Sequence, residues 1–144
     1  MKRLVVGIGL VLVVGFLAIQ LVPYGRDHTN PPVVAEPAWD SPATRAYAVT
    51  ACFDCHSNQA VWPWYSNIAP VSWLIQHDVD EGRAVLNYSD WGRGQEGDES
   101  AEAVSEGEMP PFVYILTHPD ADFSEADRAA FIRGLIATFG GGGN

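Results

Sequence analysis

Basic side chains are scarce in this chain of 144 residues, and its single lysine is Lys2. After residue 22, six arginines face eighteen acidic residues, so that part carries a formal charge of −12. A surface of this sign has no basic patch to neutralise phosphates, which excludes nucleic-acid binding. The sequence also lacks an internal repeat, a phosphate-binding glycine loop and a hydrolase triad. Its carboxylates show no pairing that indicates acid–base catalysis.

Cysteine is equally scarce, and both cysteines lie in one short motif. Cys52 and Cys55 are followed directly by His56, which gives the pattern C-x-x-C-H. This pattern is typical of covalent haem attachment. Two thiols three positions apart lie on one side of a helical turn, where each can add to one vinyl group of the porphyrin. The next residue then offers an imidazole to the iron.

Three other interpretations of the two cysteines compete with haem attachment. A dithiol redox centre usually follows a strand in a βαβ context, but the preceding residues here predict a helix. A zinc site needs further ligands, and the sequence contains no second C-x-x-C or H-x₃-H. A disulfide would close a very small loop and add little stability. One covalent haem c is therefore the expected cofactor.

The first 22 residues predict a membrane anchor. Leu4 to Val22 is apolar apart from glycines and Gln20, and about 28 Å of helix is close to the ~30 Å hydrocarbon core. The sequence after Ile19 offers no small-x-small cleavage site, so an uncleaved helix is favoured over a signal peptide. Lys2 and Arg3 would keep the N-terminus cytoplasmic, with the rest of the chain in the periplasm or outside.

The remaining chain divides into three further regions. Residues 23–40 contain four prolines and predict an extended linker that lifts the domain off the membrane, with His28 as an exposed linker histidine. Residues 41–139 form the predicted haem c-binding domain, and residues 140–144 a glycine-rich tail.

Within the domain the patterns predict helices. The first begins after the N-cap Ser41 and delivers the two cysteines near its C-terminal end. A second spans residues 71–81, with Val71, Ile75 and Val79 as its buried stripe and Gly82 as its end. A short helix over residues 99–106 precedes the last one, which Ser124 caps and Gly140 stops. The expected apolar face of the last helix consists of Phe131, Ile132, Leu135, Ile136 and Phe139.

Three residues were singled out as haem contacts besides the attachment motif. Trp62 and Trp64 lie in an aromatic segment interrupted by prolines, and either indole N–H suits a haem propionate; plain core packing is the alternative. Arg83 also suits a propionate, although helix carbonyls or an acidic neighbour are equally good partners.

The sixth iron ligand has one leading candidate. Met109 is the only methionine besides the initiator, and it lies in a loop stiffened by Gly107 and by Pro110-Pro111. A stiff loop that presents one thioether suits the distal position. His77, His118 and the absence of a protein ligand are the alternatives.

Several of these motifs, in this order, resemble those of the bacterial haem-binding domain family of cytochrome c-like proteins. They are Asn30-Pro-Pro-Val33, Glu36-Pro-Ala-Trp-Asp-Ser-Pro42, Cys52-x-x-Cys-His-Ser-Asn58, Trp62-Pro-Trp-Tyr-Ser66, Ile68-Ala-Pro-Val-Ser-Trp73, Gly82-Arg83, Leu86-Asn-Tyr-Ser89, Trp91, Gly107-Glu-Met-Pro-Pro111 and His118-Pro119. The resemblance implies one covalent haem c, with Cys52, Cys55 and His56 in their usual roles. By analogy with class I cytochromes c, it also implies a small all-α domain around the haem.

One-electron transfer on the periplasmic side of the cytoplasmic membrane is the expected function. The expected partners are a membrane redox complex or other electron donor and acceptor proteins, and their docking surface would have to be basic because this chain has no lysine ring. Two alternatives stay open: a ligand sensor or peroxidase-like protein with an open distal site, and a structural haem subunit of a larger complex. An electron carrier fits the sequence better than an enzyme.

Overall fold

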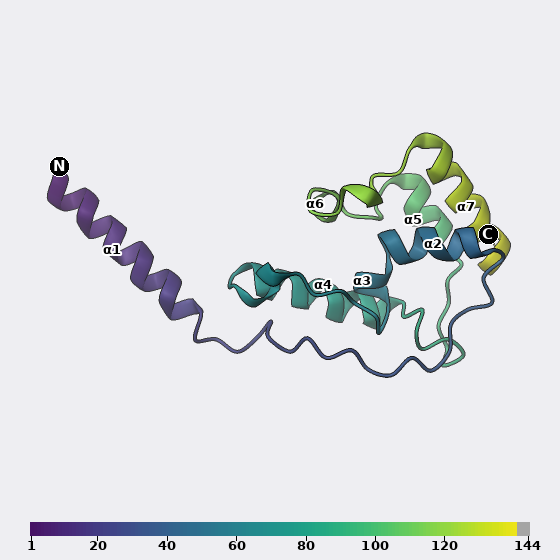
Figure 1. The fold of residues 1–144 in the computed structure, drawn as a ribbon, viewed down its shortest axis with the longest axis horizontal. Coiled ribbons are helices and arrows are strands. Elements are labelled where there is room, and N and C mark those ends of the chain that lie inside the picture. Colours follow the sequence, from purple (N-terminus) through teal and green to yellow (C-terminus); the bar gives the residue numbers. More distant parts are fainter. Residues whose placement is uncertain (141–144) are drawn as a thin grey trace. The chain divides into compact units, whose positions relative to one another are not determined.

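The computed structural model describes residues 1–140, which form seven α-helices and two short 3₁₀ helices without a β-strand (Figure 1). The only pairing of strand type within these residues is an isolated bridge between Ala35 and Asp90. The predicted all-α fold with one N-terminal apolar helix is confirmed. Residues 141–144 of the predicted tail lie outside the described residues.

The N-terminal helix α1 spans Lys2–Ile19, and none of its residues is buried. It is long and apolar enough to cross a membrane, and among residues 1–140 it is the one helix that meets that test. Eighteen residues make about 27 Å of helix, close to the hydrocarbon thickness of a bilayer.

The chain folds into two compact units. Unit 1 comprises residues 1–29 and 62–80, and unit 2 comprises residues 30–61 and the described residues from 81 onward. Unit 2 therefore contains the C-x-x-C-H motif and Met109, and unit 1 contains α1 and the aromatic segment.

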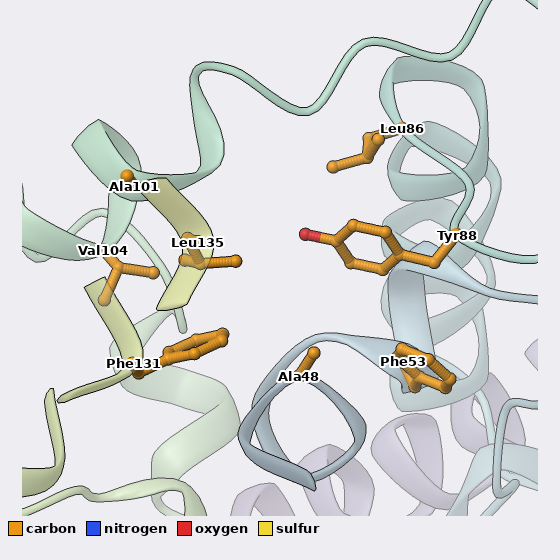
Figure 2. Close-up of a cluster of buried hydrophobic side chains, with 8 residues drawn as sticks. All are labelled: Ala48, Phe53, Leu86, Tyr88, Ala101, Val104, Phe131 and Leu135. Carbon is orange, nitrogen blue, oxygen red and sulfur yellow. The ribbon is translucent and has the colours of Figure 1, made fainter. Parts of the chain in front are cut away.

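The core of unit 2 lies where α2 (Pro42–Ala51) and α5 (Ser100–Glu106) each pack on α7 (Glu125–Phe139). The packing of α2 on α7 is close, because a Cβ at Gly134 would lie 2.0 Å from Thr44 Oγ1. Figure 2 shows the Tyr88 ring between Phe53 and Leu86, with its hydroxyl toward Leu135. The fully or nearly fully buried apolar side chains of this cluster are Ala48, Phe53, Leu86, Tyr88, Ala101, Val104, Phe131 and Leu135.

The helix ends follow the sequence signals in most places. Ser41 Oγ accepts the Thr44 amide, and Ser124 Oγ accepts the Asp127 amide, so both predicted N-caps are confirmed. Gly140 ends α7 at φ 84°, a left-handed φ that glycine adopts without strain. The predicted apolar face of α7 is confirmed except at Ile136, which is 46% exposed.

Two helix predictions were wrong. The first helix does not carry both cysteines, because it ends at Cys52 (φ −127°) and a separate turn, α3, covers Phe53–His56. The second helix, α4, does not end at Gly82 but runs from Val71 to Val85. Gly82 is needed inside the helix, since a Cβ there would lie 2.5 Å from the Cys55 carbonyl oxygen. The predicted buried stripe fails at Val71, which is 43% exposed.

The C-terminal end of α1 is attached to the rest of unit 1 by side-chain contacts. Gln20 makes two hydrogen bonds with the Ala69 backbone, donating to its carbonyl at 2.9 Å and accepting its amide at 3.0 Å. His28 is also not an exposed linker histidine as predicted. Its ring stacks on Trp62 at 4.4 Å, and its Nε2 lies 3.2 Å from the Ser66 carbonyl.

The segment before α2 is hydrogen-bonded to other parts of unit 2. The Val34 amide donates to the Ser89 carbonyl at 2.8 Å, and the Trp91 amide donates to the Ala35 carbonyl at 3.1 Å. Glu36 accepts both Nε and Nη2 of Arg45, at 2.6 and 2.7 Å. The Trp39 indole and the Gln59 amide also donate to Glu36. These contacts hold residues 34–39 against the rest of unit 2.

The carboxylate of Glu36 gives stability a defined pH dependence. Its hydrogen bonds, chiefly with Arg45, lower the pKa of Glu36 below the ordinary value of 4.5. Its contribution is therefore present above about pH 4.5 and is lost as the pH falls through the lower folded pKa. We expect Glu36→Gln to reduce the free energy of unfolding by about 1–2 kcal/mol at pH 7. Urea denaturation should show this deficit shrinking towards pH 3.

A matched control is Glu96→Gln, which changes an exposed glutamate in the loop before α5. This variant should unfold like the wild type at both pH values. A deficit for Glu36→Gln that stays constant between pH 7 and pH 3 would contradict the assigned role.

Candidate functional site

The attachment motif lies at the junction of α2 and α3. Cys52 caps the end of α2 and precedes the turn that contains Cys55 and His56. Both cysteines are free thiols and are partly exposed. Burial, and secondarily the neighbouring Cys55 sulfur, raises the pKa of the Cys52 thiol to about 12. The junction thus holds two unoxidised thiols and an imidazole within five residues.

His56 is held in the orientation that an iron ligand requires. Its Nδ1 lies 3.0 Å from the Leu86 carbonyl, a partner that can only accept, so Nδ1 carries the proton. The lone pair is therefore on Nε2, and a hydrogen bond of this kind fixes the ring plane of many metal-bound histidines. Burial lowers the pKa of His56, which the carbonyls of Leu86 and Gly82 partly offset. Neutral imidazole, the form that binds iron, is favoured.

A buried polar network locks the residues after His56, and the sequence analysis missed it. Ser57 and Ser89 are fully buried, and Asn58 and Asn87 nearly so. The Asn87 amide donates to Asn58 Oδ1 at 2.9 Å, and Ser89 Oγ accepts the Asn58 amide at 3.0 Å. The motifs His-Ser-Asn and Asn-Tyr-Ser therefore interlock. The available signal was the two short Ser/Asn motifs themselves, which sequence alone does not distinguish from turn residues.

Met109 lies in a loop that the C-terminal end of α5 fixes. Gly107 has a φ of 76° and caps α5, a conformation that favours glycine. The amides of Glu108 and Met109 both donate to the Ala103 carbonyl, at 3.0 and 3.1 Å. The Met109 side chain is 36% exposed. A rigid loop that presents a partly exposed thioether suits an iron ligand, and the role of Met109 stays a prediction.

The residues after Met109 form an exposed apolar face. Short helix α6 spans Phe112–Ile115, and the spacing of Phe112, Val113 and Leu116 places these three on one side of it, with Met109 in the loop that precedes the helix. Met109 is 36% exposed, and the other three are 73, 56 and 65% exposed. A planar apolar group would remove this face from water, so the residues present fit a haem.

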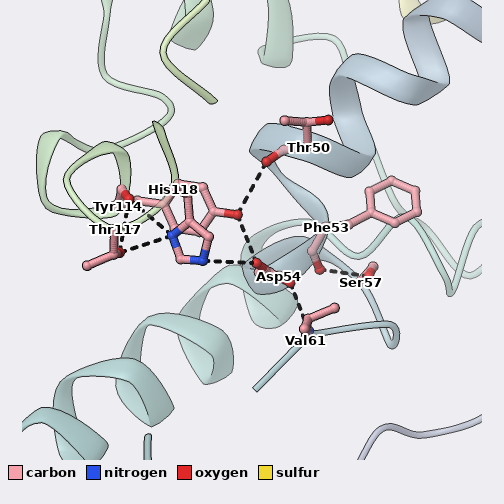
Figure 3. A network of polar contacts seen from close by, with 8 residues as sticks. All are labelled: Thr50, Phe53, Asp54, Ser57, Val61, Tyr114, Thr117 and His118. Carbon is pink, nitrogen blue, oxygen red and sulfur yellow. Dashed lines mark hydrogen bonds and ion pairs between the residues drawn. The ribbon is translucent and has the colours of Figure 1, made fainter. Parts of the chain in front are cut away.

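Tyr114 connects α6 to the attachment motif. Its hydroxyl donates to Asp54 Oδ2 at 2.8 Å (Figure 3), and Asp54 lies between the two cysteines in the sequence. The other Asp54 oxygen accepts the Val61 amide at 2.8 Å. The His118 ring stacks on Tyr114 at 3.9 Å, with its Nε2 3.7 Å from Asp54 Oδ2. Burial, followed by the Asp54 charge, raises the pKa of Tyr114, so its hydroxyl stays protonated as a donor.

Removal of the Tyr114 hydroxyl should therefore loosen the motif. We expect Tyr114→Phe to lower the free energy of unfolding by about 1.5–3 kcal/mol, because the lost hydrogen bond has a charged acceptor. Urea denaturation measures this. Tyr24→Phe is the control, because Tyr24 is 46% exposed and its hydroxyl has no hydrogen bond within residues 1–140. Equal stability of the two variants would show that the Asp54 contact contributes nothing.

The three predicted propionate contacts have different surroundings. Arg83 Nε donates to the Ser57 carbonyl and Nη2 to Asn30 Oδ1, both at 2.8 Å, so it binds neither helix carbonyls nor an acidic side chain in these contacts. The Trp62 Nε1 is buried, and no acceptor for it occurs among the described residues. An acceptor from a bound group would satisfy it, as it would the equally buried Nε1 of Trp73. Trp64 is 77% exposed. Their haem contacts stay predictions.

The two alternative iron ligands, His77 and His118, differ in how firmly their side chains are held. His77 is exposed on α4. His118 Nδ1 lies 3.1 Å from the Tyr114 carbonyl, and its ring is stacked, so a move to iron would break these contacts. His118 was expected at a helix end bonded to backbone, and this is where it lies.

Comparison with known proteins gives one match. Neither the curated proteins nor the solved structures contain a significant match to the chain. The sequence does match the haem-binding domain family over residues 14–136, which begins within α1 and extends into α7. A match of that extent includes the C-x-x-C-H motif, the interlocked Ser/Asn pairs and the Met109 loop. We conclude that the chain belongs to the haem-binding domain family.

Proposed function

We propose that this haem-binding protein is a monohaem c-type cytochrome that transfers single electrons at the outer face of the cytoplasmic membrane. The observation that carries the proposal is the arrangement at the end of α2. Two free thiols precede a histidine whose Nδ1 is held by the Leu86 carbonyl, which leaves Nε2 to bind iron. Cys52 and Cys55 would form the two thioether bonds.

Each protein group has a distinct task in this proposal. Bound haem supplies a one-electron couple at its iron. His56 and Met109 would bind the iron, and both come from segments that hydrogen bonds fix. Little rearrangement is then needed when the charge changes. The Trp62 N–H would bind a propionate, and α1 would hold the carrier near membrane redox complexes, where the effective concentration is high.

The contacts of His118 with Tyr114 and Asp54 support electron transfer over the alternative of a sensor or peroxidase-like protein with an open distal site. A distal acid–base residue must come within hydrogen-bond reach of a ligand bound to the iron. His118 is instead stacked on Tyr114 and lies beside Asp54.

Two measurements on the full-length protein in detergent test the proposal. An alkaline pyridine spectrum of the reduced protein should have the band position of haem with two saturated vinyl groups. Mixing with excess carbon monoxide should give slow binding, because the sixth position is filled. Rapid binding with an unchanged spectrum would indicate an open distal site and would remove the electron-carrier assignment.

A further inference from the structure

The stretch around the 3₁₀ helix η1 (Trp64–Asn67) differs in charge from the rest of the chain. From Ser57 to Gln76 there is no Asp, Glu, Lys or Arg, although the part beyond residue 22 carries eighteen acidic residues and six arginines. A stretch of this length without charge has no ionic side chains that would oppose its burial in an apolar environment.

That surface is made of large apolar side chains which unit 1 does not cover. Trp64 is 77% exposed, Ile68 36%, Val71 43% and Leu74 52%. They follow one another at intervals of three or four residues from η1 into the first turns of α4. We call these four residues the interfacial surface.

Three contacts within unit 1 place this surface beside the end of α1. Gln20, the C-cap of α1, holds both backbone groups of Ala69, the residue next to Ile68. Gly25 has a φ of 81°, and a Cβ there would lie 2.4 Å from the Ser72 carbonyl oxygen. His28 stacks on Trp62 at 4.4 Å. These three contacts lie within the nine residues from Gln20 to His28. They hold the chain directly after α1 against residues 62–72, so this part of the chain does not act as an extended spacer.

We propose that the interfacial surface lies in the headgroup layer of the membrane that α1 spans. The inference rests on the membrane anchor of the proposed function. If α1 crosses the hydrocarbon core, Gln20 is at its boundary, and Ala69 is within hydrogen-bond distance of Gln20. Tryptophan is enriched at this depth, and neighbouring aliphatic side chains bury their apolar area there. For Trp64 this assignment replaces a propionate contact, and it leaves Trp62 unaffected.

The absence of charge on the surface also defines the class of lipid. Because residues 57–76 contain no lysine or arginine, the interfacial surface itself offers no attraction to anionic headgroups, and burial of apolar area is its driving force. The proposal therefore commits to a lipid surface of any headgroup charge, and not to an acidic lipid site.

Photocrosslinking in vesicles tests the proposal. The full-length, haem-loaded protein would be reconstituted at low density into phosphatidylcholine vesicles that contain a lipid with a diazirine near its glycerol backbone. After irradiation, mass spectrometry locates the lipid adducts. We expect adducts on residues 62–74 and on α1, with the same yield when part of the lipid is phosphatidylglycerol.

The outcomes separate this inference from the anchor itself. Adducts on α1 without any on residues 62–74 would overturn the interfacial surface and leave the anchor intact. Adducts on neither would remove both. Adducts on residues 62–74 without any on α1 would also overturn the inference, because the proposed surface lies in the membrane that α1 spans. Crosslinks from this segment to a second copy of the chain, without lipid, would overturn the inference in favour of a homodimer interface.

A variant pair makes the test quantitative. In the double variant Trp64→Gln, Leu74→Gln, the adduct yield on residues 62–74 should fall about fivefold relative to that on α1, because two of the four apolar groups are gone. Val85→Gln removes a valine that is 76% exposed in unit 2 and should leave the ratio unchanged. The haem absorption spectrum of each variant verifies folding.

Discussion

Replacement of both cysteines by alanine should convert haem retention in acidified organic solvent from complete to none. In the wild type, two thioether bonds would hold the porphyrin even when the chain is unfolded. In the variant Cys52→Ala, Cys55→Ala, only the His56–iron bond and apolar packing remain, and acid protonates the imidazole. Extraction followed by absorption and intact-mass measurement checks this result.

The native state of the same variant provides the control. The Leu86 carbonyl that orients His56 belongs to another segment, and it does not depend on the thiols. We therefore expect the variant to bind haem reversibly under native conditions. The single variants should retain haem through one thioether, with an intermediate pyridine spectrum. Colour that washes out of the wild type as easily as out of the double variant would contradict covalent attachment.

The second large effect is expected at the sixth iron position. Met109→Ala should abolish the methionine-type absorption of the ferric protein and lower the reduction potential by on the order of 0.2 V, a part of the roughly 0.8 V range that axial ligands span. Carbon monoxide binding should become fast. Redox titration and stopped-flow absorption measure these changes.

Two comparisons make the Met109 result specific. Met109→Leu preserves the apolar volume without the thioether, so it should reproduce the spectrum of Met109→Ala with less loss of stability. His77→Ala and His118→Ala should both keep the wild-type spectrum. If one of the histidine variants loses the low-spin spectrum while Met109→Ala keeps it, that histidine is the ligand.

Local sequence signals correctly predicted the helix starts that have their own caps. They failed where a helix end depends on contacts with a distant segment. Ser41 and Ser124 bind amides three residues away, so their sequences contain the whole interaction. Gly82 was predicted as a helix end because glycine commonly terminates helices. Glycine is instead needed at this position because the Cys55 backbone lies close to it. Cys55 is 27 positions earlier in the sequence, so a local pattern does not reveal the contact.

The residues of the candidate site also fall into those that the sequence could predict and those that it could not. The C-x-x-C-H motif and the Met109 loop were recognisable because their chemistry depends on spacing and residue type. The partner of His56 was not, since it is the main-chain carbonyl of Leu86 and any residue would supply one. The buried Asn58–Asn87 bond was also missed, because polar residues are more often exposed.

The predicted linker shows what composition leaves out. Proline-rich sequences are commonly extended spacers, and residues 23–40 have that composition. The specific contacts in this region and at the helix end before it come from single side chains, namely Glu36 with Arg45 and Gln20 with Ala69. A lone glutamine in an apolar helix and one glutamate among eighteen acidic residues carry no sequence signal of such partners.

The hydrogen bond between His56 and Leu86 has a consequence for the order in which the protein matures. During synthesis the thiols and the imidazole emerge thirty residues before the carbonyl that orients the ring. A nascent chain that ends before Leu86 thus displays the complete attachment motif with a freely rotating histidine. Any machinery that joins haem to such a chain must itself orient the imidazole. The Leu86 carbonyl can take over this role only after the later segment has been synthesised.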